Sequence, residues 1–524
     1  MIITTLLLII NILVASNTAY FSSLWFIPIA SIAWLYFYLH KFKSLAGIFT
    51  GSLIFFFTYY LVGLWWLGYS FVNISVNSTL VPWILTVIFL LSNAIISSLL
   101  ISLSFYIPRN KYLKMTTVSL SIWVADFLRE YFLSGFEWLS FGYSQVSTYS
   151  LAGFIPVIGV HGVSSLVVLC AILLYLSFYN RSYSPFLALC CILLTSNILN
   201  KINWTQPDHS KEAINIAIVQ AVPSQREKKY IIDHNKLIRR YISLTQEAKK
   251  QAYEPIDWIL LPESAFIDLN THSFKQFKRA NQDLTVFAGV NIKKTSISKR
   301  QNGIIKVNNT KFVYHKTKLI PFAEQTPKWG NSIKKYLNLR FDEIIIPSKL
   351  DNQNIYYKNT VSNFFICYEV GMSKYWLSKV EESNFFILFS SMLWYSNTNG
   401  PMQLFQMARA RSIETGRPVT IVSDTGYSSV IYPDNNDTQH SWLEPMQIAV
   451  LLDQIKSYSG KTPYSYLAYY EFTVFIIYSI LLLTSFYYRK KNLFHRTHKS
   501  TNRRRYRTPR ASVPKTQQLD HLFR

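Results

Sequence analysis

Long apolar segments dominate the chain, seven within the first 200 residues and one near the end. They cover residues 2–16, 21–40, 46–71, 80–107, 115–133, 150–179, 184–200 and 464–488. Most approach the roughly 20 residues that a helix needs to cross the hydrocarbon core of a bilayer. We therefore predict a multi-span α-helical membrane bundle of about eight transmembrane helices. The first segment lacks a basic flank and has only a weak cleavage match, so we interpret it as a retained helix rather than a signal peptide.

Basic residues alternate between the loops of this bundle. They occur on one side only, at Lys41, Lys43, Arg109, Lys111, Lys114 and Arg181. The loops near 15–20, 72–79 and 134–149 contain no lysine or arginine. Because cytoplasmic loops carry the excess of positive charge, we expect both termini in the cytoplasm. Residues 205–460 then lie on the outer face, which is the periplasm in a cell with two membranes.

Much of the net charge of +25 comes from the end of the chain, residues 489–524, which includes Arg503-Arg-Arg-Tyr-Arg507. Such a run could bind nucleic acid. The basic run has no aromatic residue beyond Tyr506, so we expect no nucleic-acid partner. We interpret it instead as a basic cytoplasmic tail, disordered and lying on anionic lipid.

Several polar residues interrupt the apolar segments. Asp126, Arg129 and Glu130 fall within the segment at 115–133. Charges inside a span usually face the bundle interior, although this helix could instead lie partly at the interface. The aromatic run Phe136–Tyr143 suggests a membrane surface. We interpret His161 as a packed or hydrogen-bonded core residue, and the histidine and cysteine spacing predicts no metal site and no cofactor.

From Ile214 onward the pattern changes to alternating strands and helices. We predict buried strands at 214–220, 258–262, 284–290, 364–367, 385–389 and 418–422, and helices at 229–252 and 402–415. This alternation is typical of an α/β sheet with its site at the strand ends. The predicted organisation is a seven-span bundle at 1–204, a catalytic domain at 205–460, a final span at 464–488 and the tail at 489–524.

Three reactive side chains are candidates for a site at strand ends: Glu263 follows the predicted strand 258–262, Cys367 ends the strand 364–367, and Lys316 lies in the segment Tyr314–Glu324. Among the four cysteines, only Cys367 lies in the polar half of the chain. A lone thiol at a strand end is a candidate nucleophile, although free cysteine is often a small core residue. A strand-end glutamate is commonly a solvated acid, and a lysine is commonly exposed. Each residue alone is therefore weak evidence of catalysis.

The sequences that flank these residues are more specific. Tyr314-His-Lys-Thr-Lys-Leu-Ile-Pro-Phe-Ala-Glu324 and Cys367-Tyr-Glu369 resemble motifs of the apolipoprotein N-acyltransferase family, the membrane-bound branch of the nitrilase (carbon–nitrogen hydrolase) superfamily. Trp394-Tyr395, Gly400-Pro401 and Gly416-Arg-Pro418 follow in the family's order. Ile320 and Ala323 replace a usual valine and glycine, and Ser391-Met-Leu393 replaces a usual Asn-Asp-Ala. The basic tail is also unusual for the family.

The resemblance implies a nitrilase-like αββα sandwich that transfers a fatty acyl chain from a phospholipid to the N-terminal S-diacylglyceryl-cysteine of apolipoproteins. This is the last step of lipoprotein maturation, and Cys367 would carry the acyl group as a thioester. Glu263 would act as general base and acid, and Lys316 would stabilise the oxyanion. Glu324 and Glu369 would orient Lys316 or close the site. Tyr368 and Trp394 would contact substrate, as could Trp329 and Tyr395, although ordinary packing explains these aromatic residues equally well.

The expected partners are the phospholipid donor, phosphatidylethanolamine, and the diacylated apolipoprotein acceptor. We expect a monomer in the inner membrane. Two alternatives remain open at this stage. A membrane-anchored nitrilase-type amidase would use the same residues, because water competes with the amine for the thioester. A catalytically silent scaffold that binds lipoproteins would not need all three side chains.

Overall fold

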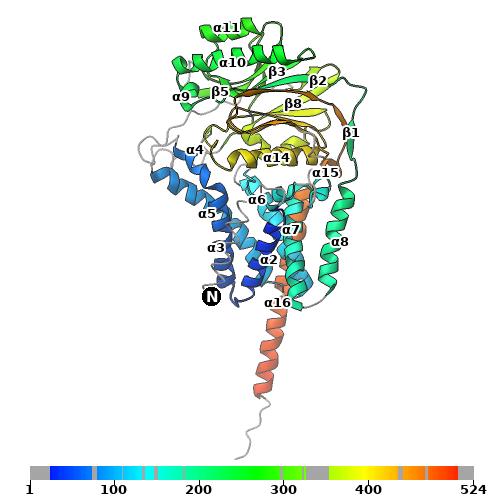
Figure 1. Cartoon of the computed structure of the whole chain (residues 1–524). Coiled ribbons are helices and arrows are strands. Elements are labelled where there is room, and N and C mark those ends of the chain that lie inside the picture. The colour runs from blue at the N-terminus through cyan, green and yellow to red at the C-terminus, as the bar shows by residue number, and fades with distance from the viewer. Residues whose placement is uncertain are drawn as a thin grey trace, which may run out of the picture.

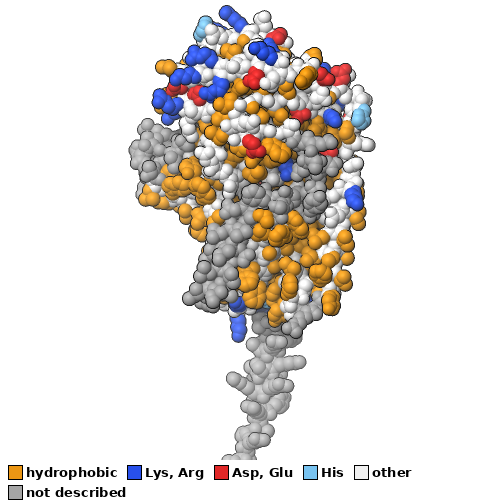
Figure 2. Space-filling view, in the orientation of Figure 1, with side chains coloured by type: hydrophobic (Ala, Val, Ile, Leu, Met, Phe, Trp, Pro, Cys, Tyr) orange, Lys and Arg blue, Asp and Glu red, His pale blue; other side chains and the backbone are white. Residues whose placement is uncertain are grey.

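A computed structural model of the 524-residue chain describes residues 24–72, 80–108, 110–132, 136–146, 151–180, 183–294, 299–320, 324–325, 353–434, 441–466 and 470–505. The predicted first span at 2–16 and the aromatic residue Trp329 lie outside these ranges. An α/β domain lies at one end of a helical bundle, and the last helix, α16, extends away from the opposite end (Figure 1). Hydrophobic side chains gather over the bundle, whereas most charged side chains lie on the α/β domain (Figure 2).

The bundle is built from helices that run along one another. Its elements are α2 (Ile27–Leu39), α3 (Leu45–Leu64), η2 (Trp65–Leu67), α4 (Gly68–Val72), α5 (Leu80–Tyr106), α6 (Lys111–Phe132), η3 (Phe141–Gln145), η4 (Leu151–Phe154), α7 (Ile155–Asn180), α8 (Tyr183–Leu199), α15 (Pro463–Tyr466) and α16 (Tyr470–Arg505).

Four helical segments in the described residues are long and apolar enough to cross a membrane. They are Leu45–Ser70, Leu80–Tyr106, Leu151–Tyr179 and Tyr470–Lys491. The helices α2 and α8 are apolar but shorter, and α6 carries the buried pair Arg129–Asp126, whose charged atoms lie 2.5 Å apart. The structure therefore supports a membrane protein without confirming eight spans. The polar residues predicted to face the bundle interior do so at Asp126 and Arg129.

The aromatic side chains of the segment Phe136–Tyr143 are buried, as is Glu137. One expectation about this part was wrong. The basic residues 489–505, expected to be disordered, continue helix α16. Lysine and arginine have high helix propensity. Starting a helix is the costly step, and the apolar half of α16 is already helical, so the basic residues only extend it.

The centre of the α/β domain is two six-stranded sheets packed face to face, with strand orders β13-β2-β3-β4-β5-β6 and β12-β11-β10-β9-β8-β7, and β1 and β14 form a separate two-stranded sheet. The strands and helices are β1 (Thr205–Pro207), β2 (Ile214–Gln220), α9 (Gln225–Lys229), α10 (Ile231–Gln251), β3 (Trp258–Phe266), α11 (His272–Ala280), β4 (Thr285–Lys294), β5 (Lys299–Lys306), β6 (Lys311–His315), β7 (Ile355–Tyr357), β8 (Thr360–Ile366), η6 (Cys367–Gly371), α13 (Ser373–Leu377), β9 (Phe385–Ser390), α14 (Gly400–Thr415), β10 (Val419–Ser423), β11 (Ser428–Ile431), β12 (Trp442–Leu443), β13 (Ala449–Ile455) and β14 (Tyr458–Gly460).

The predicted buried strands form the centres of both sheets. The strands β2, β3 and β4 are parallel neighbours, as are β8, β9 and β10. Large side chains from both sheets, including Trp258, Phe287 and Phe364, fill the space between them. Helices α10 and α11 cover one outer face, whereas α14 lies between the other sheet and the bundle (Figure 1). This is the expected αββα sandwich. The sequence pattern did not predict the edge strands of the two sheets, because they are more polar.

A buried ionic cluster joins the α/β domain to the bundle. Arg411 on α14 lies 3.0 Å from Glu414 and 3.7 Å from Glu137, and its Nη2 donates to the Tyr143 hydroxyl at 2.7 Å. Helix α7 is interrupted at Gly159, where φ is +67°, and the following Val160 N–H donates to Glu414 at 2.8 Å. The cluster therefore ties the domain to the start of a membrane helix.

We expect Arg411→Met to destabilise the protein by on the order of 3–5 kcal/mol, because it leaves two buried carboxylates without their cation. Thermal unfolding in detergent micelles measures the effect. The matched control is Arg226→Met, which removes an arginine whose side chain is 78% exposed. Equal unfolding temperatures for the two variants would contradict a stabilising role for the cluster.

Candidate active site

Cys367 occupies a sharp turn at the end of the parallel strand β8. Its φ is +48°, in the left-handed region that non-glycine residues rarely adopt. The turn redirects the chain from the strand into the short helix η6. Such strained backbone persists only where surrounding contacts hold it in place, and it is common at functional sites. The thiol is thereby placed at the sheet edge where the other strand-end residues meet.

Glu263 is set by an irregularity in β3. The β3–β4 register shifts between Leu261 and Phe266, and Ser264 has a φ of +56°. Gly289 on β4 permits the close approach: a Cβ there would lie 2.4 Å from the Pro262 carbonyl oxygen and 2.5 Å from the Glu263 Cα. Any larger residue at position 289 would displace the backbone that carries the Glu263 carboxylate.

The Glu263 carboxylate accepts hydrogen bonds on both oxygens. Its Oε1 accepts from Asn302 Nδ2 at 2.9 Å and from Lys316 Nζ at 3.3 Å. Its Oε2 accepts from the Ser391 main-chain N–H at 3.1 Å. These donors fix the orientation of the carboxylate. The amide of Asn302 and the main chain of Ser391 were missed from the sequence. A main-chain donor has no residue-type pattern that could have revealed it.

Lys316, which follows β6, is buried between two acids. Its Nζ lies 2.7 Å from Glu324 Oε1 and 3.3 Å from Glu263 Oε1. Burial alone would lower the pKa of Lys316, but Glu263, Glu324 and the nearby Cys367 raise it above its ordinary value. The ammonium is therefore permanently charged, as an oxyanion-stabilising group must be.

The environment of Cys367 favours the neutral thiol at rest. Burial raises the pKa of the Cys367 thiol, and the Glu263 carboxylate raises it further. The Lys316 ammonium and a hydrogen bond from the Ser391 N–H act in the opposite direction without reversing the shift. A thiol that stays protonated needs a base when it attacks, and the neighbouring Glu263 carboxylate can take the proton.

Glu369 is fully buried and holds two segments of the site together. Its Oε1 accepts from the Thr317 N–H at 2.8 Å, the Thr317 hydroxyl at 2.9 Å and the Lys318 N–H at 3.1 Å. Its Oε2 accepts from the Tyr314 hydroxyl at 2.6 Å and the Ile366 N–H at 2.7 Å. Glu369 therefore joins the loop after Lys316 to the turn that carries Cys367.

The aromatic residues singled out in the sequence lie toward the bundle. Tyr368 is buried and stacks on Trp138, with ring centroids 5.6 Å apart. Trp394 is 41% exposed. Tyr395 packs edge-on against Trp66 at 4.7 Å and bonds to the Ser70 hydroxyl. The turn that carries Cys367 and the loop that carries Tyr395 therefore pack against the bundle.

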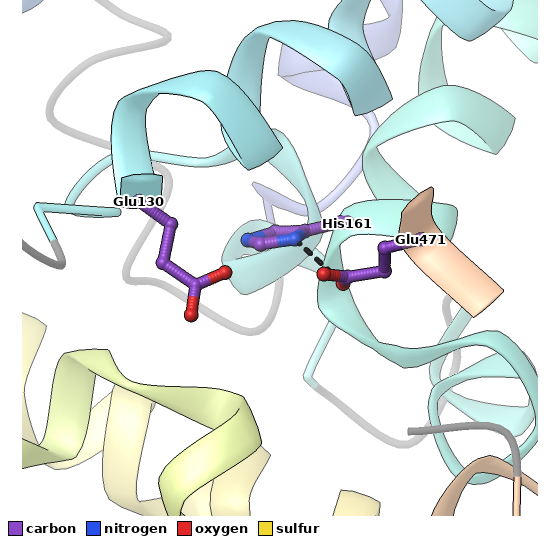
Figure 3. Close-up of side chains that lie close together, drawn as sticks. All are labelled: Glu130, His161 and Glu471. Carbon is purple, nitrogen blue, oxygen red and sulfur yellow. Dashed lines mark hydrogen bonds and ion pairs between the residues drawn. The ribbon is translucent and has the colours of Figure 1, made fainter. Parts of the chain in front are cut away.

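One group of side chains has the spacing of a metal site. Ligand atoms of Glu130, His161 and Glu471 lie within 4.8 Å of one another (Figure 3). Both His161 ring nitrogens already bond to carboxylates, Nδ1 to Glu471 and Nε2 to Glu137, each at 2.9 Å. The Lys374 ammonium lies 3.0 Å from the second Glu471 oxygen. The Lys374 ammonium therefore pairs with one of these acids, and His161 is the hydrogen-bonded core residue that the sequence suggested.

Comparison with known proteins matches both parts of the chain. Residues 12–173 match the apolipoprotein N-acyltransferase N-terminal domain, and residues 215–450 match the carbon-nitrogen hydrolase family. The chain is 28% identical over 416 residues to the apolipoprotein N-acyltransferase of Wigglesworthia glossinidia brevipalpis, covering 74% of this chain and 79% of that protein. It is 29% identical over 376 residues to the same-named protein of Coxiella burnetii, covering 69% and 75%.

A solved CN-hydrolase superfamily protein from Xanthomonas campestris is also similar to the chain. The two are 15% identical, and the match covers 47% of this chain and 91% of that one, with a TM-score of 0.33.

We expect alkylation of Cys367 by iodoacetamide to keep accelerating with pH beyond about 8.5, the ordinary pKa of a thiol, because its pKa is raised. Lys316→Met should raise the pKa further and slow the reaction at every pH. Glu263→Gln should lower the pKa of Cys367 and speed the reaction. Mass spectrometry of the Cys367 peptide measures the rates, and Lys311→Met, an exposed lysine on β6, is the control. A rate that levels off below pH 8 would contradict the assignment.

Proposed function

The chain belongs to the apolipoprotein N-acyltransferase family of the nitrilase superfamily and is a membrane acyltransferase of lipoprotein maturation; on that premise we propose its substrates and chemical course. The donor is a phospholipid, phosphatidylethanolamine, whose fatty acyl chain passes to Cys367 as a thioester. The acceptor is the α-amino group of the N-terminal S-diacylglyceryl-cysteine of an apolipoprotein. Glu263, Lys316 and Cys367 are the catalytic residues.

The placement of Cys367 is the observation that carries this proposal. Cys367 packs against the core between the two sheets and also against the apolar core that continues into the membrane helices. The adjacent Tyr368 and the nearby Tyr395 contact Trp138 and Trp66 of the bundle. A diacyl phospholipid does not diffuse far from a bilayer, so a nucleophile at this junction suits a lipid donor. A water-soluble amide would not require this position.

In the first half-reaction the Cys367 sulfur attacks the ester carbonyl of the phospholipid while Glu263 takes the thiol proton. The developing oxyanion is stabilised by the Lys316 ammonium, which Glu324 holds in place. The bond from the carbonyl carbon to the glycerol oxygen then breaks. Glu263 returns its proton to that oxygen, which releases a lysophospholipid and leaves the acyl thioester on Cys367.

In the second half-reaction the neutral α-amine of the acceptor attacks the thioester carbonyl. Glu263 takes one proton from the attacking nitrogen, and Lys316 again stabilises the oxyanion. The carbon–sulfur bond breaks as the amide forms, and Glu263 delivers the proton to the departing thiolate. The enzyme returns to its starting state with a neutral thiol, which burial and the neighbouring Glu263 carboxylate favour by raising the pKa of Cys367.

The distribution of basic residues supports an inner-membrane protein with a periplasmic catalytic domain. The Arg489 guanidinium lies 3.9 Å from the centre of the Tyr106 ring, and Lys114 lies 4.6 Å from that of Phe105. These contacts lie at the ends of α5 and α6 far from the α/β domain, where α16 leaves the bundle (Figure 1). By the positive-inside rule this end is cytoplasmic. A single copy contains the complete triad, so we propose a monomer.

Incubating the purified protein with phosphatidylethanolamine should add one fatty acyl group, seen by intact mass and removed by hydroxylamine. Cys367→Ser should not give the hydroxylamine-sensitive adduct. A diacylated lipopeptide should then discharge the wild-type adduct into a triacylated product, whereas the same lipopeptide with an acetylated α-amine should not. Discharge to free fatty acid regardless of the amine would favour the amidase alternative. A folded protein that forms no adduct would favour the silent scaffold.

A further inference from the structure

A buried lysine–aspartate pair lies directly behind the catalytic carboxylate. The Lys228 Nζ is 2.6 Å from Asp424 Oδ2, and the two side chains are 11% and 0% exposed. Lys228 also donates to the main-chain carbonyl of Glu263 at 2.9 Å and to the Ser391 hydroxyl at 3.0 Å. One ammonium therefore bonds at the same time to the strand that carries Glu263 and to the loop that follows β9.

Asp424 holds that loop from the other side. Its Oδ2 accepts from the Ser391 hydroxyl at 2.6 Å, and its Oδ1 accepts from the Met392 N–H at 2.9 Å. The Ser391 main-chain N–H in turn donates to Glu263 Oε2 at 3.1 Å, and it also lowers the pKa of the Cys367 thiol. The contacts thus run from the ion pair, through Ser391, to two of the three catalytic side chains.

We propose that Lys228 and Asp424 are positioning residues for acyl transfer: they fix Ser391 so that its main-chain N–H points at the Glu263 carboxylate and the Cys367 sulfur. The proposal rests on the proposed function for its reaction but concerns residues that do not touch the reacting atoms. It also explains how the Ser391-Met-Leu393 departure from the family pattern is accommodated. The contact to Glu263 comes from the main chain, and the serine side chain serves only to bind the ion pair.

The ion pair is more than a generic support of the fold. A buried ion pair gains little stability over apolar residues of similar volume, because both charges lose their hydration. The contacts of this pair instead fix Ser391, whose main-chain N–H donates to the Glu263 carboxylate and lowers the pKa of Cys367. A comparable pair serves as a reference: Lys249 Nζ binds Asp283 Oδ1 at 2.8 Å and the Ala280 carbonyl at 3.1 Å, but it lies in a more exposed position between α10 and α11.

The segment that supplies Lys228 is itself firmly held. Helix α9 begins with a capping box in which the Ser224 side chain bonds to the Glu227 N–H and Glu227 bonds to the Ser224 N–H. Glu227 also pairs with Arg240 of α10 at 3.0 Å. The Lys228 ammonium is therefore delivered by a short helix fixed at its start, so its position depends little on the exposed residues that follow it.

The test measures two rates in the full-length protein in detergent micelles. The first is acylation of Cys367 by phosphatidylethanolamine over a range of lipid concentrations. The second is alkylation of Cys367 by iodoacetamide over a range of pH, which needs no lipid. The variants are Lys228→Met, Asp424→Asn and the double variant, with Lys249→Met as the matched control. Asp424→Asn is nearly isosteric and tests the pair even where Lys228→Met lowers folding yield.

Lys228→Met and Asp424→Asn should each lower the maximal acylation rate about 10- to 100-fold, the loss expected from misplacing reacting groups by up to an ångström. The lipid concentration at half-maximal rate should change little. The double variant should lose little more than either single variant, because both act through Ser391. Loosening the Ser391 N–H should also raise the pKa of Cys367 and so slow its alkylation at a fixed pH. Lys249→Met should match wild type in both rates.

Wild-type acylation and alkylation rates in folded Asp424→Asn would overturn the positioning role. So would losses that merely follow the fraction of unfolded protein in each variant. If the wild type itself forms no acyl adduct, the proposed function fails instead. The pH dependence of alkylation then still tests whether Lys228 and Asp424 position the site, because it reports on the environment of Cys367 without any substrate.

Discussion

The Lys316 ammonium lies out of water between the carboxylates of Glu263 and Glu324, and the rest of the site is arranged around it. Such a charge is costly to bury unless it is paired and hydrogen-bonded. Once paired, it is a preorganised positive charge in a region that excludes water, where an oxyanion gains most from it. The two acids have separate tasks: Glu324 holds the lysine, while Glu263 can also exchange a proton with Cys367.

The need to pair every buried charge also governs how the α/β domain packs against the membrane helices. Arg411, Glu137, His161 and Glu471 are buried at the junction and compensate one another across elements from both parts. Truncating one member leaves an opposite charge unpaired, so the parts are held in a defined relation. That relation places Cys367 against the apolar core shared with the bundle. Charge compensation at the interface and the proposed access of a lipid to Cys367 therefore depend on the same packing of the domain against the bundle.

Local patterns predicted the elements that depend on local physics. Ile214–Gln220 alternates and is fully a strand, because its side chains are buried on both faces within a sandwich. Cys367, Glu263 and Lys316 were identified because each follows such a strand and carries a recognisable flank. The helical continuation through Arg489–Arg505 was not predicted, since composition suggested a solvated tail while an already formed helix favoured extension. The burial of the aromatic run Phe136–Tyr143 was not predicted, because the domain that packs against it comes much later in the chain.

By itself, the sequence determined the membrane segments near 46–71, 80–107 and 150–179, the strand-rich domain that follows, and the three reactive side chains. These could be predicted because the spacing of apolar residues and the motifs beside each side chain are local properties of the sequence. Only the tertiary structure decided that Glu369 is a buried clamp, that the Ser391 main chain faces Glu263, and that Lys228 pairs with Asp424. These contacts join residues far apart in the chain, or use main-chain groups that every residue carries. Whether a charge is solvated or buried depends on which strands meet, and no local pattern contains that information.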